Sequence, residues 1–79
     1  MLPIQCKMAR TALGLGVRDL AQKADKSPTT IAKFERGEGL RAETVADIRR
    51  TLEKAGVEFI AENGGGAGVR LAKRKPKNR

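Results

Sequence analysis

Two short amphipathic segments, separated by a break of three residues, constrain the fold of this chain more than any other feature. In residues 17–24 the apolar side chains fall within one stripe of a helix and the charged side chains face away. Ser27 closes the break with a side-chain oxygen suited to a helix N-cap, and Pro28 follows where its missing N–H costs nothing. The pattern therefore predicts helices over residues 17–24 and 28–36, which pack closely at the small Ala21.

Apolar spacing predicts one further helix on each side of this pair. Pro3 suits the first turn of a helix over residues 3–13, in which apolar residues recur at spacings of three and four until Gly14. Residues 42–55 carry acidic side chains early and basic ones late, and Gly56 follows them, as helix termini favour. The chain is therefore predicted to be mainly α, with about four helices.

The pattern changes after the fourth predicted helix. Residues 57–60 and 69–72 are short β-prone runs, and the segment that joins them is too rich in glycine for a helix. A β-hairpin within one chain and strands exchanged between two subunits both fit this pattern. From Lys73 onward the apolar surface is too small to offset the entropy lost on ordering, which predicts a disordered basic tail.

The net charge of +8 is concentrated at the C-terminus. Residues 70–79 hold six basic side chains and no acidic one, whereas residues 1–69 hold 11 basic and 9 acidic ones, a net charge of +2. A basic tail alone would bind any polyanion or simply aid solubility. The charge of the predicted helical part is therefore not a sufficient argument for a nucleic-acid partner.

Several classes of protein are excluded by what the sequence lacks. The glycine run at 64–68 has neither the Lys-Ser/Thr of a P-loop nor a helix after it, so a flexible turn is predicted instead of a nucleotide site. The chain has no histidine, Cys6 has no imidazole partner, and the acids are spread over helix surfaces. We therefore predict no enzymatic activity, no cofactor and no metal.

Cysteine content and hydropathy bear on the compartment. A single cysteine, Cys6, excludes an internal disulfide, and nothing at the N-terminus resembles an apolar signal segment. No apolar run approaches the ~20 residues that span a bilayer. We predict a cytoplasmic, nucleoid-associated protein without a membrane role, and the sequence assigns no function to Cys6.

Residues 17–37 resemble the Cro-and-repressor, or XRE, family of DNA-binding regulators, and the similarity extends over roughly residues 5–55. Two departures are Asp25, where a turn glycine is usual, and Gly16-Val17, where the family commonly has a polar cap. The resemblance implies a lambda-repressor-like helix-turn-helix fold. The matching positions are Leu20-Ala21, Ser27, Ile31 and Phe34-Glu35-Arg36-Gly37.

The resemblance also implies an ion pair and a domain organisation. In many members an Arg of the first helix pairs with the Glu of this motif, so Arg10 is expected to bind Glu35, the alternative being two separately solvated charges. Residues 1–56 would form the helix-turn-helix DNA-binding domain, residues 57–72 a β-hairpin or dimerisation element, and residues 73–79 the tail.

Side-chain chemistry then assigns roles on the predicted recognition helix, Pro28–Arg36. Thr29, Thr30 and Lys33 are the candidates for base contacts in the major groove, while Ile31 and Phe34 are expected in the core. The candidates for phosphate contacts lie at the helix ends and in the next loop, and for each the alternative is a solvated charge or a simple cap. They are Lys26, Ser27, Arg36 and Arg41.

Selective binding normally needs two half-sites about one helical turn, ~34 Å, apart, which predicts a homodimer on a pseudopalindromic operator. RNA polymerase is a possible further partner, and no small-molecule ligand is expected. Two alternatives are a protein-binding antitoxin or antiactivator on the same fold, and a nonspecific nucleoid or RNA-associated protein acting through its tail. The predicted dimer interface comprises Leu52, Val57, Phe59, Ile60, Val69 and Leu71.

Overall fold

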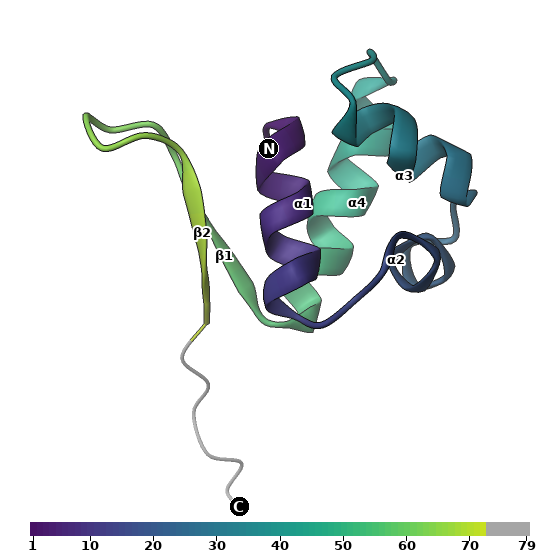
Figure 1. Cartoon of the computed structure of the whole chain (residues 1–79), viewed down its shortest axis with the longest axis horizontal. Helices are drawn as coiled ribbons and strands as arrows, with labels where there is room; N and C mark the ends of the chain where they lie inside the picture. Colours follow the sequence, from purple (N-terminus) through teal and green to yellow (C-terminus); the bar gives the residue numbers. More distant parts are fainter. Residues whose placement is uncertain (73–79) are drawn as a thin grey trace, which may run out of the picture.

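The computed structural model describes residues 1–72, which form four helices followed by a two-stranded antiparallel sheet (Figure 1). The predicted mainly α fold is therefore confirmed, and within the chain the two strands form a hairpin. The predicted tail lies outside the described residues. No helix in the described part is long and apolar enough to cross a membrane. The elements are α1 (Pro3–Ala12), α2 (Val17–Ala24), α3 (Pro28–Glu35), α4 (Ala42–Ala55), β1 (Val57–Ile60) and β2 (Gly68–Leu71).

The bounds of α2, α4 and β1 agree with the prediction, and four other bounds differ by one residue: the ends of α1 and α3 and both ends of β2, which ends at Leu71 and not at Ala72. Leu13 and Arg36 are not the last helical residues but the C-caps of α1 and α3, with ψ near 0°. Their backbones turn toward Gly14 and Gly37, which have positive φ values of 73° and 91°. Strand β2 begins at Gly68, because Gly68 pairs with Ile60 in the ladder.

The turn between α2 and α3 is built by two polar residues. Asp25 takes up the left-handed conformation, with φ 57° and ψ 45°, as a residue in the position of the usual glycine must. Ser27 then caps α3, because its Oγ accepts a hydrogen bond from the backbone N–H of Thr30 at 3.1 Å. The chain therefore reverses between two short helices within three residues, which places α2 and α3 in direct contact.

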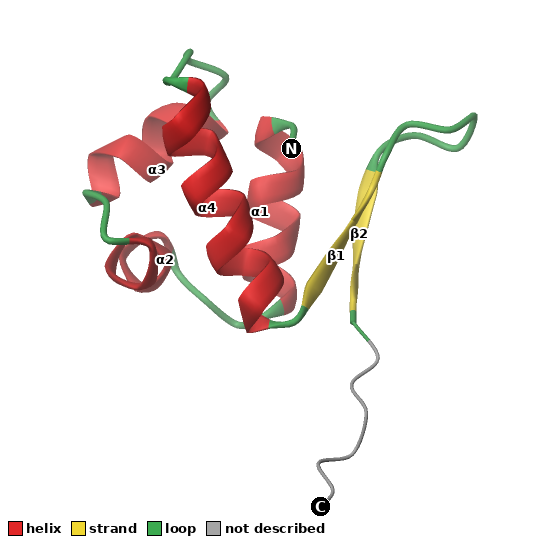
Figure 2. Cartoon of the chain, turned by 180° about the vertical axis from the view of Figure 1, so that it is seen from behind, coloured by secondary structure: helices red, strands yellow, loops and turns green. Residues whose placement is uncertain are grey.

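One apolar core joins the helices to the base of the hairpin. Leu20, Ile31, Ile48 and Leu52 are each 0% exposed, so every helix except α1 contributes a large aliphatic side chain. Helix α1 contributes the smaller Cys6 and Ala9, and β1 contributes Val57. The hairpin packs on α1 and α4 and extends away from α2 and α3, which lie on the other side of those two helices (Figures 1 and 2).

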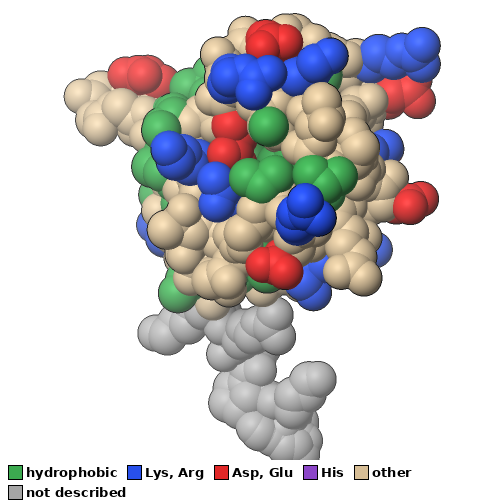
Figure 3. Space-filling view, turned by 45° about the vertical axis from the view of Figure 1, so that its right-hand side comes forward, with side chains coloured by type: hydrophobic (Ala, Val, Ile, Leu, Met, Phe, Trp, Pro, Cys, Tyr) green, Lys and Arg blue, Asp and Glu red, His purple; other side chains and the backbone are tan. Residues whose placement is uncertain are grey.

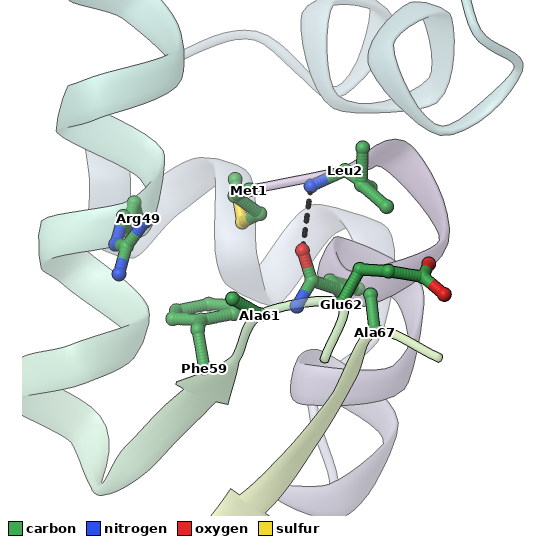
Figure 4. Close-up of a pocket in the computed structure, with 8 residues that line it drawn as sticks. Met1, Leu2, Arg49, Phe59, Ala61, Glu62 and Ala67 are labelled. Atoms are coloured by element: carbon green, nitrogen blue, oxygen red, sulfur yellow. Dashed lines mark hydrogen bonds between the residues drawn. The ribbon is translucent and has the colours of Figure 1, made fainter. Parts of the chain in front are cut away.

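Gln5 holds the hairpin against α1, and it is the only buried polar side chain among the described residues. Its Nε2 donates to the carbonyl oxygens of Ile60 and Gly68, at 3.0 and 2.9 Å, which face each other across the ladder. Its Oε1 accepts from the backbone N–H of Leu2 at 2.8 Å (Figure 4). The amide nitrogen and oxygen of Gln5 and the two strand carbonyls thereby all have hydrogen-bond partners, around a side chain that is only 4% exposed.

Candidate nucleic-acid interface

Helix α3 separates its side chains into two faces. Ile31 and Phe34 are 0% and 6% exposed and belong to the core. Thr29 and Lys33 are exposed, and the side chain of Lys33 forms no hydrogen bond or ion pair with residues 1–72. The spacing of four residues sets Thr29 and Lys33 on the same face, one turn apart. A polar face with a hydroxyl and an ammonium group is therefore presented outward from a helix anchored at its back.

Helix α3 is tied to α1 by the Arg10–Glu35 ion pair that the family resemblance implies. The guanidinium donates twice to the carboxylate, Nε to Oε2 at 2.7 Å and the terminal amine to Oε1 at 2.9 Å. The two side chains are 15% and 9% exposed, so the pair is largely shielded from water. The hydrogen bonds from Arg10 to Glu35 raise the pKa of the guanidinium above its ordinary value. A two-pronged contact of this kind fixes both the position and the orientation of α3 relative to α1.

Cys6 contributes to the same contact, although no function was predicted for it from the sequence. Its thiol is fully buried and lies 3.4 Å from Oε2 of Glu35, to which it donates. Burial, followed by the hydrogen bond and the negative charge of Glu35, raises the pKa of the thiol to about 12. Cys6 is therefore a neutral donor in the core at neutral pH and not a nucleophile.

The hydroxyl groups at the start of α3 bond to each other. Ser27 Oγ and Thr30 Oγ1 are 2.9 Å apart, in addition to the bond from the Thr30 backbone N–H. Each hydroxyl has further lone pairs, and Ser27 is exposed. The candidates Ser27 and Thr30 are thus brought together at one end of the outward face, where their first role is to cap the helix.

Two of the candidate phosphate-binding cations are paired with acids. Lys26 Nζ lies 2.9 Å from Asp47 Oδ2 on α4, and Arg36 lies 2.9 Å from Glu38. The hydrogen bond from Lys26, with the charges of Lys26 and Arg50, lowers the pKa of Asp47. Figure 3 turns the α2 and α3 side of Figure 1 toward the viewer and shows acidic side chains next to basic ones on this face. The surface is therefore a mixed one and not a uniform basic patch.

Arg41 differs from these two cations. It is exposed and serves as the N-cap residue of α4 through its backbone, with no side-chain capping bond. No ion pair to residues 1–72 holds its guanidinium. Arg41 and Lys33 are therefore the candidate DNA-contacting cations that have no ion pair among residues 1–72.

Sequence reasoning missed the two acids. Glu38 follows Arg36 by only two residues, so the closeness of the two charges in the sequence could have indicated that ion pair. Asp47 is 21 residues from Lys26 and meets it only because α4 packs against α2. No pattern of neighbouring residues in the sequence could have predicted that contact.

The residues predicted for a dimer interface fall into three groups. Leu52 and Val57 are 0% and 2% exposed inside the single chain, so they are core residues that a second subunit could not reach. Phe59 and Val69 are half-buried against the same core, and Arg49 lies over the Phe59 ring at 5.1 Å from its centroid. Ile60 and Leu71 are the exposed members, at 36% and 58%.

A hollow of about 260 Å³ lies between the N-terminus, α4 and the hairpin (Figure 4). Its walls are mainly apolar, with Arg49 and Glu62 as the charged members. Among the described residues no group of three or more potential metal-ligating side chains comes together. The hollow therefore carries no cluster of chemically active groups, and the outward face of α3 is the stronger candidate site.

A pair of short helices joined by a tight turn, with the second helix anchored at its back and polar outside, defines a helix-turn-helix DNA-binding protein. A helix-turn-helix family model matches residues 7–59, about two thirds of the chain. The chain belongs to this family, whose members are DNA-binding regulators of the Cro/XRE type. A search of curated protein sequences gives no match.

Proposed function

We propose that this protein is a sequence-specific regulator of transcription that acts in the cytoplasm and binds operator DNA as a homodimer. Helix α3 enters the major groove, where Lys33 donates to guanine O6 and N7 and Thr29 contacts an adjacent base edge. Thr30 and Ser27 lie where the helix meets the groove wall, and Arg36 and Arg41 bind phosphates. Lys26 contributes to the phosphate contacts only when it leaves Asp47.

The observation that carries this proposal is the orientation of α3. Ile31 and Phe34 fix the helix from behind, while Lys33 on its exposed side has no partner among residues 1–72. The exposed lysine side chain keeps its rotamer entropy in the free protein and loses it only when it binds a partner. A base edge at the floor of a groove is the partner that its length and charge fit.

The test is a selection of bound sequences from a random duplex pool, followed by affinity measurements on the selected duplex. The Lys33→Ala variant is expected to bind that duplex about ten-fold more weakly or worse, and to lose preference at one base position. The matched control is Lys54→Ala, which removes an equal charge from an exposed position on α4. It is expected to stay close to the parent protein in affinity and in base preference.

The same experiment decides between this proposal and a protein-binding antitoxin or antiactivator. A protein-binding module would show equal DNA affinities for the Lys33→Ala and Lys54→Ala variants, because α3 would not be the contact surface. Binding that is indifferent to base sequence and strongly salt-dependent would indicate a nonspecific nucleic-acid protein.

We place the dimer contact on the exposed apolar side chains of α1 and the hairpin. Among residues 1–72 the large apolar side chains with the greatest exposure are Leu2, Ile4, Ile60 and Leu71. They come from α1, from the residue before it and from the hairpin, which packs on α1. A hollow of about 480 Å³ follows α1, lined by Ile4, Met8 and Ala12 together with Lys7 and Thr11. Exposed apolar side chains of this size are typical of a protein interface.

A further inference from the structure

The two cations that flank α3 are held by carboxylates. Lys26 precedes the N-cap and is paired with Asp47, and Arg36 is the C-cap and is paired with Glu38. Lys33, in the middle of the exposed face, has no acidic partner among residues 1–72. The cation in the middle of the exposed face of α3 is thus without an acidic partner among residues 1–72, whereas the cation at each end of the helix is held in an ion pair.

Phosphates and carboxylates compete for the same donors. When a helix lies in the major groove, its ends are the parts nearest the two phosphate strands. A guanidinium binds carboxylate and phosphate oxygens with the same two-pronged geometry. Arg36 donates from Nε and from a terminal amine to Oε2 of Glu38, at 3.1 and 2.9 Å. These two donors of the guanidinium are therefore engaged in the free protein, so a phosphate that approaches the same edge competes with Glu38 for them.

The two acids differ in what happens after the exchange. Asp47 is bound by Arg50 as well as by Lys26, so it keeps a counter-charge when Lys26 turns to DNA. Glu38 has only Arg36 among the described residues. Once Arg36 binds a phosphate, Glu38 stays beside the strand as an uncompensated negative charge.

We propose that Glu38 is an intramolecular competitor for DNA phosphate, which occupies Arg36 in the free protein and weakens binding to every duplex. The inference rests on the proposed function, since it requires the C-terminal end of α3 to face DNA. A competitor of this kind lowers the electrostatic, sequence-independent part of the affinity, so occupancy of nonspecific DNA falls. Binding then depends more strongly on the base contacts of Lys33 and Thr29.

The experiment compares two variants that lose one negative charge each. Glu38→Gln frees Arg36, whereas Glu53→Gln breaks the exposed Arg49–Glu53 pair on α4. Affinity for a 20-base-pair duplex of random sequence is measured by fluorescence anisotropy at several salt concentrations. Glu38→Gln is expected to bind about two- to five-fold more tightly than Glu53→Gln, the range that an exposed ion pair allows. The slope of log K against the logarithm of the salt concentration is expected to steepen by the amount that corresponds to about one additional phosphate contact.

A second pair of variants tests whether Glu38 acts through Arg36. In the Arg36→Ala background, the gain from Glu38→Gln is expected to shrink, because only the repulsion between Glu38 and the phosphate strand is then removed. A full gain without Arg36 would overturn the proposal, because the acid would then act on DNA by its charge alone. Equal affinities for Glu38→Gln and Glu53→Gln in the parent background would overturn it as well.

The failure of this inference is separable from failure of the proposed function. If Lys33→Ala weakens specific binding while Glu38→Gln matches its control, α3 reads DNA and only the competitor role is wrong. If the parent protein does not bind duplex DNA through Lys33, the proposed function fails and the competitor role fails with it.

Discussion

Glu35 receives three hydrogen bonds from α1, two from Arg10 and one from Cys6. A carboxylate this shielded is stable as an ion only while these donors remain in place. The three side chains come from positions 25 and 29 residues apart, so they fix α3 relative to the N-terminal helix. At the residue scale, this contact sets the direction in which Lys33 points.

Loss of the cation is therefore expected to be costly. We predict that Arg10→Ala lowers the free energy of unfolding by about 2–3 kcal/mol, since it leaves Glu35 without its counter-charge in a site that is mostly closed to water. The control is Glu53→Ala, which breaks the Arg49–Glu53 pair, whose two side chains are both 44% exposed. That loss is expected to be at most about 0.5 kcal/mol. Urea unfolding followed by circular dichroism measures both, and equal losses would contradict the structural role of Arg10.

The elements themselves could be predicted largely from local signals. Pro28 after Ser27 gave the start of α3, and Gly56 gave the end of α4, because caps and breakers act within a few residues. Contacts over long separations could not be predicted in the same way. Gln5 binds carbonyl groups 55 and 63 residues away, and no periodicity indicates that partnership. The pairing of Arg10 with Glu35 was expected only because the family resemblance implied it.

At the scale of elements, Gln5 is the joint between α1 and the hairpin. We predict that Gln5→Glu lowers the free energy of unfolding by about 1–3 kcal/mol, because a carboxylate cannot donate to the carbonyl oxygens of Ile60 and Gly68. The hairpin amides are expected to lose hydrogen-exchange protection before those of α2 and α3. A loss of protection spread evenly over the chain would contradict the local role of Gln5.

The two proposed contact surfaces lie on opposite sides of the molecule. Helices α2 and α3 lie on one side of α1 and α4, and the hairpin lies on the other (Figure 1). The core that joins them is made mainly of aliphatic side chains, and Phe34 is the one buried aromatic among residues 1–72. A protein of 79 residues with such a core gains stability from a partner that covers its exposed apolar groups.

The dimer proposal predicts a separation of the two activities. Leu71→Glu is expected to convert a dimer into a folded monomer, because it puts a charge into the proposed contact at a side chain that is 58% exposed in the single chain. Thr29→Glu adds the same charge to the exposed face of α3 and is expected to abolish DNA binding while the dimer persists. Sedimentation equilibrium measures the mass of both variants. A Leu71→Glu variant that remains dimeric would exclude this face as the contact.

The central claim is that the exposed face of α3 is the surface that meets DNA. The most direct measurement is an NMR titration of the isotopically labelled protein with the selected duplex, read at each backbone amide and at the Lys33 side chain. The account predicts that the largest changes fall on Thr29 to Arg36 and on Arg41, with α1 and the hairpin little affected at constant dimer concentration. Changes confined to the hairpin or to α1, with α3 unperturbed, would contradict it.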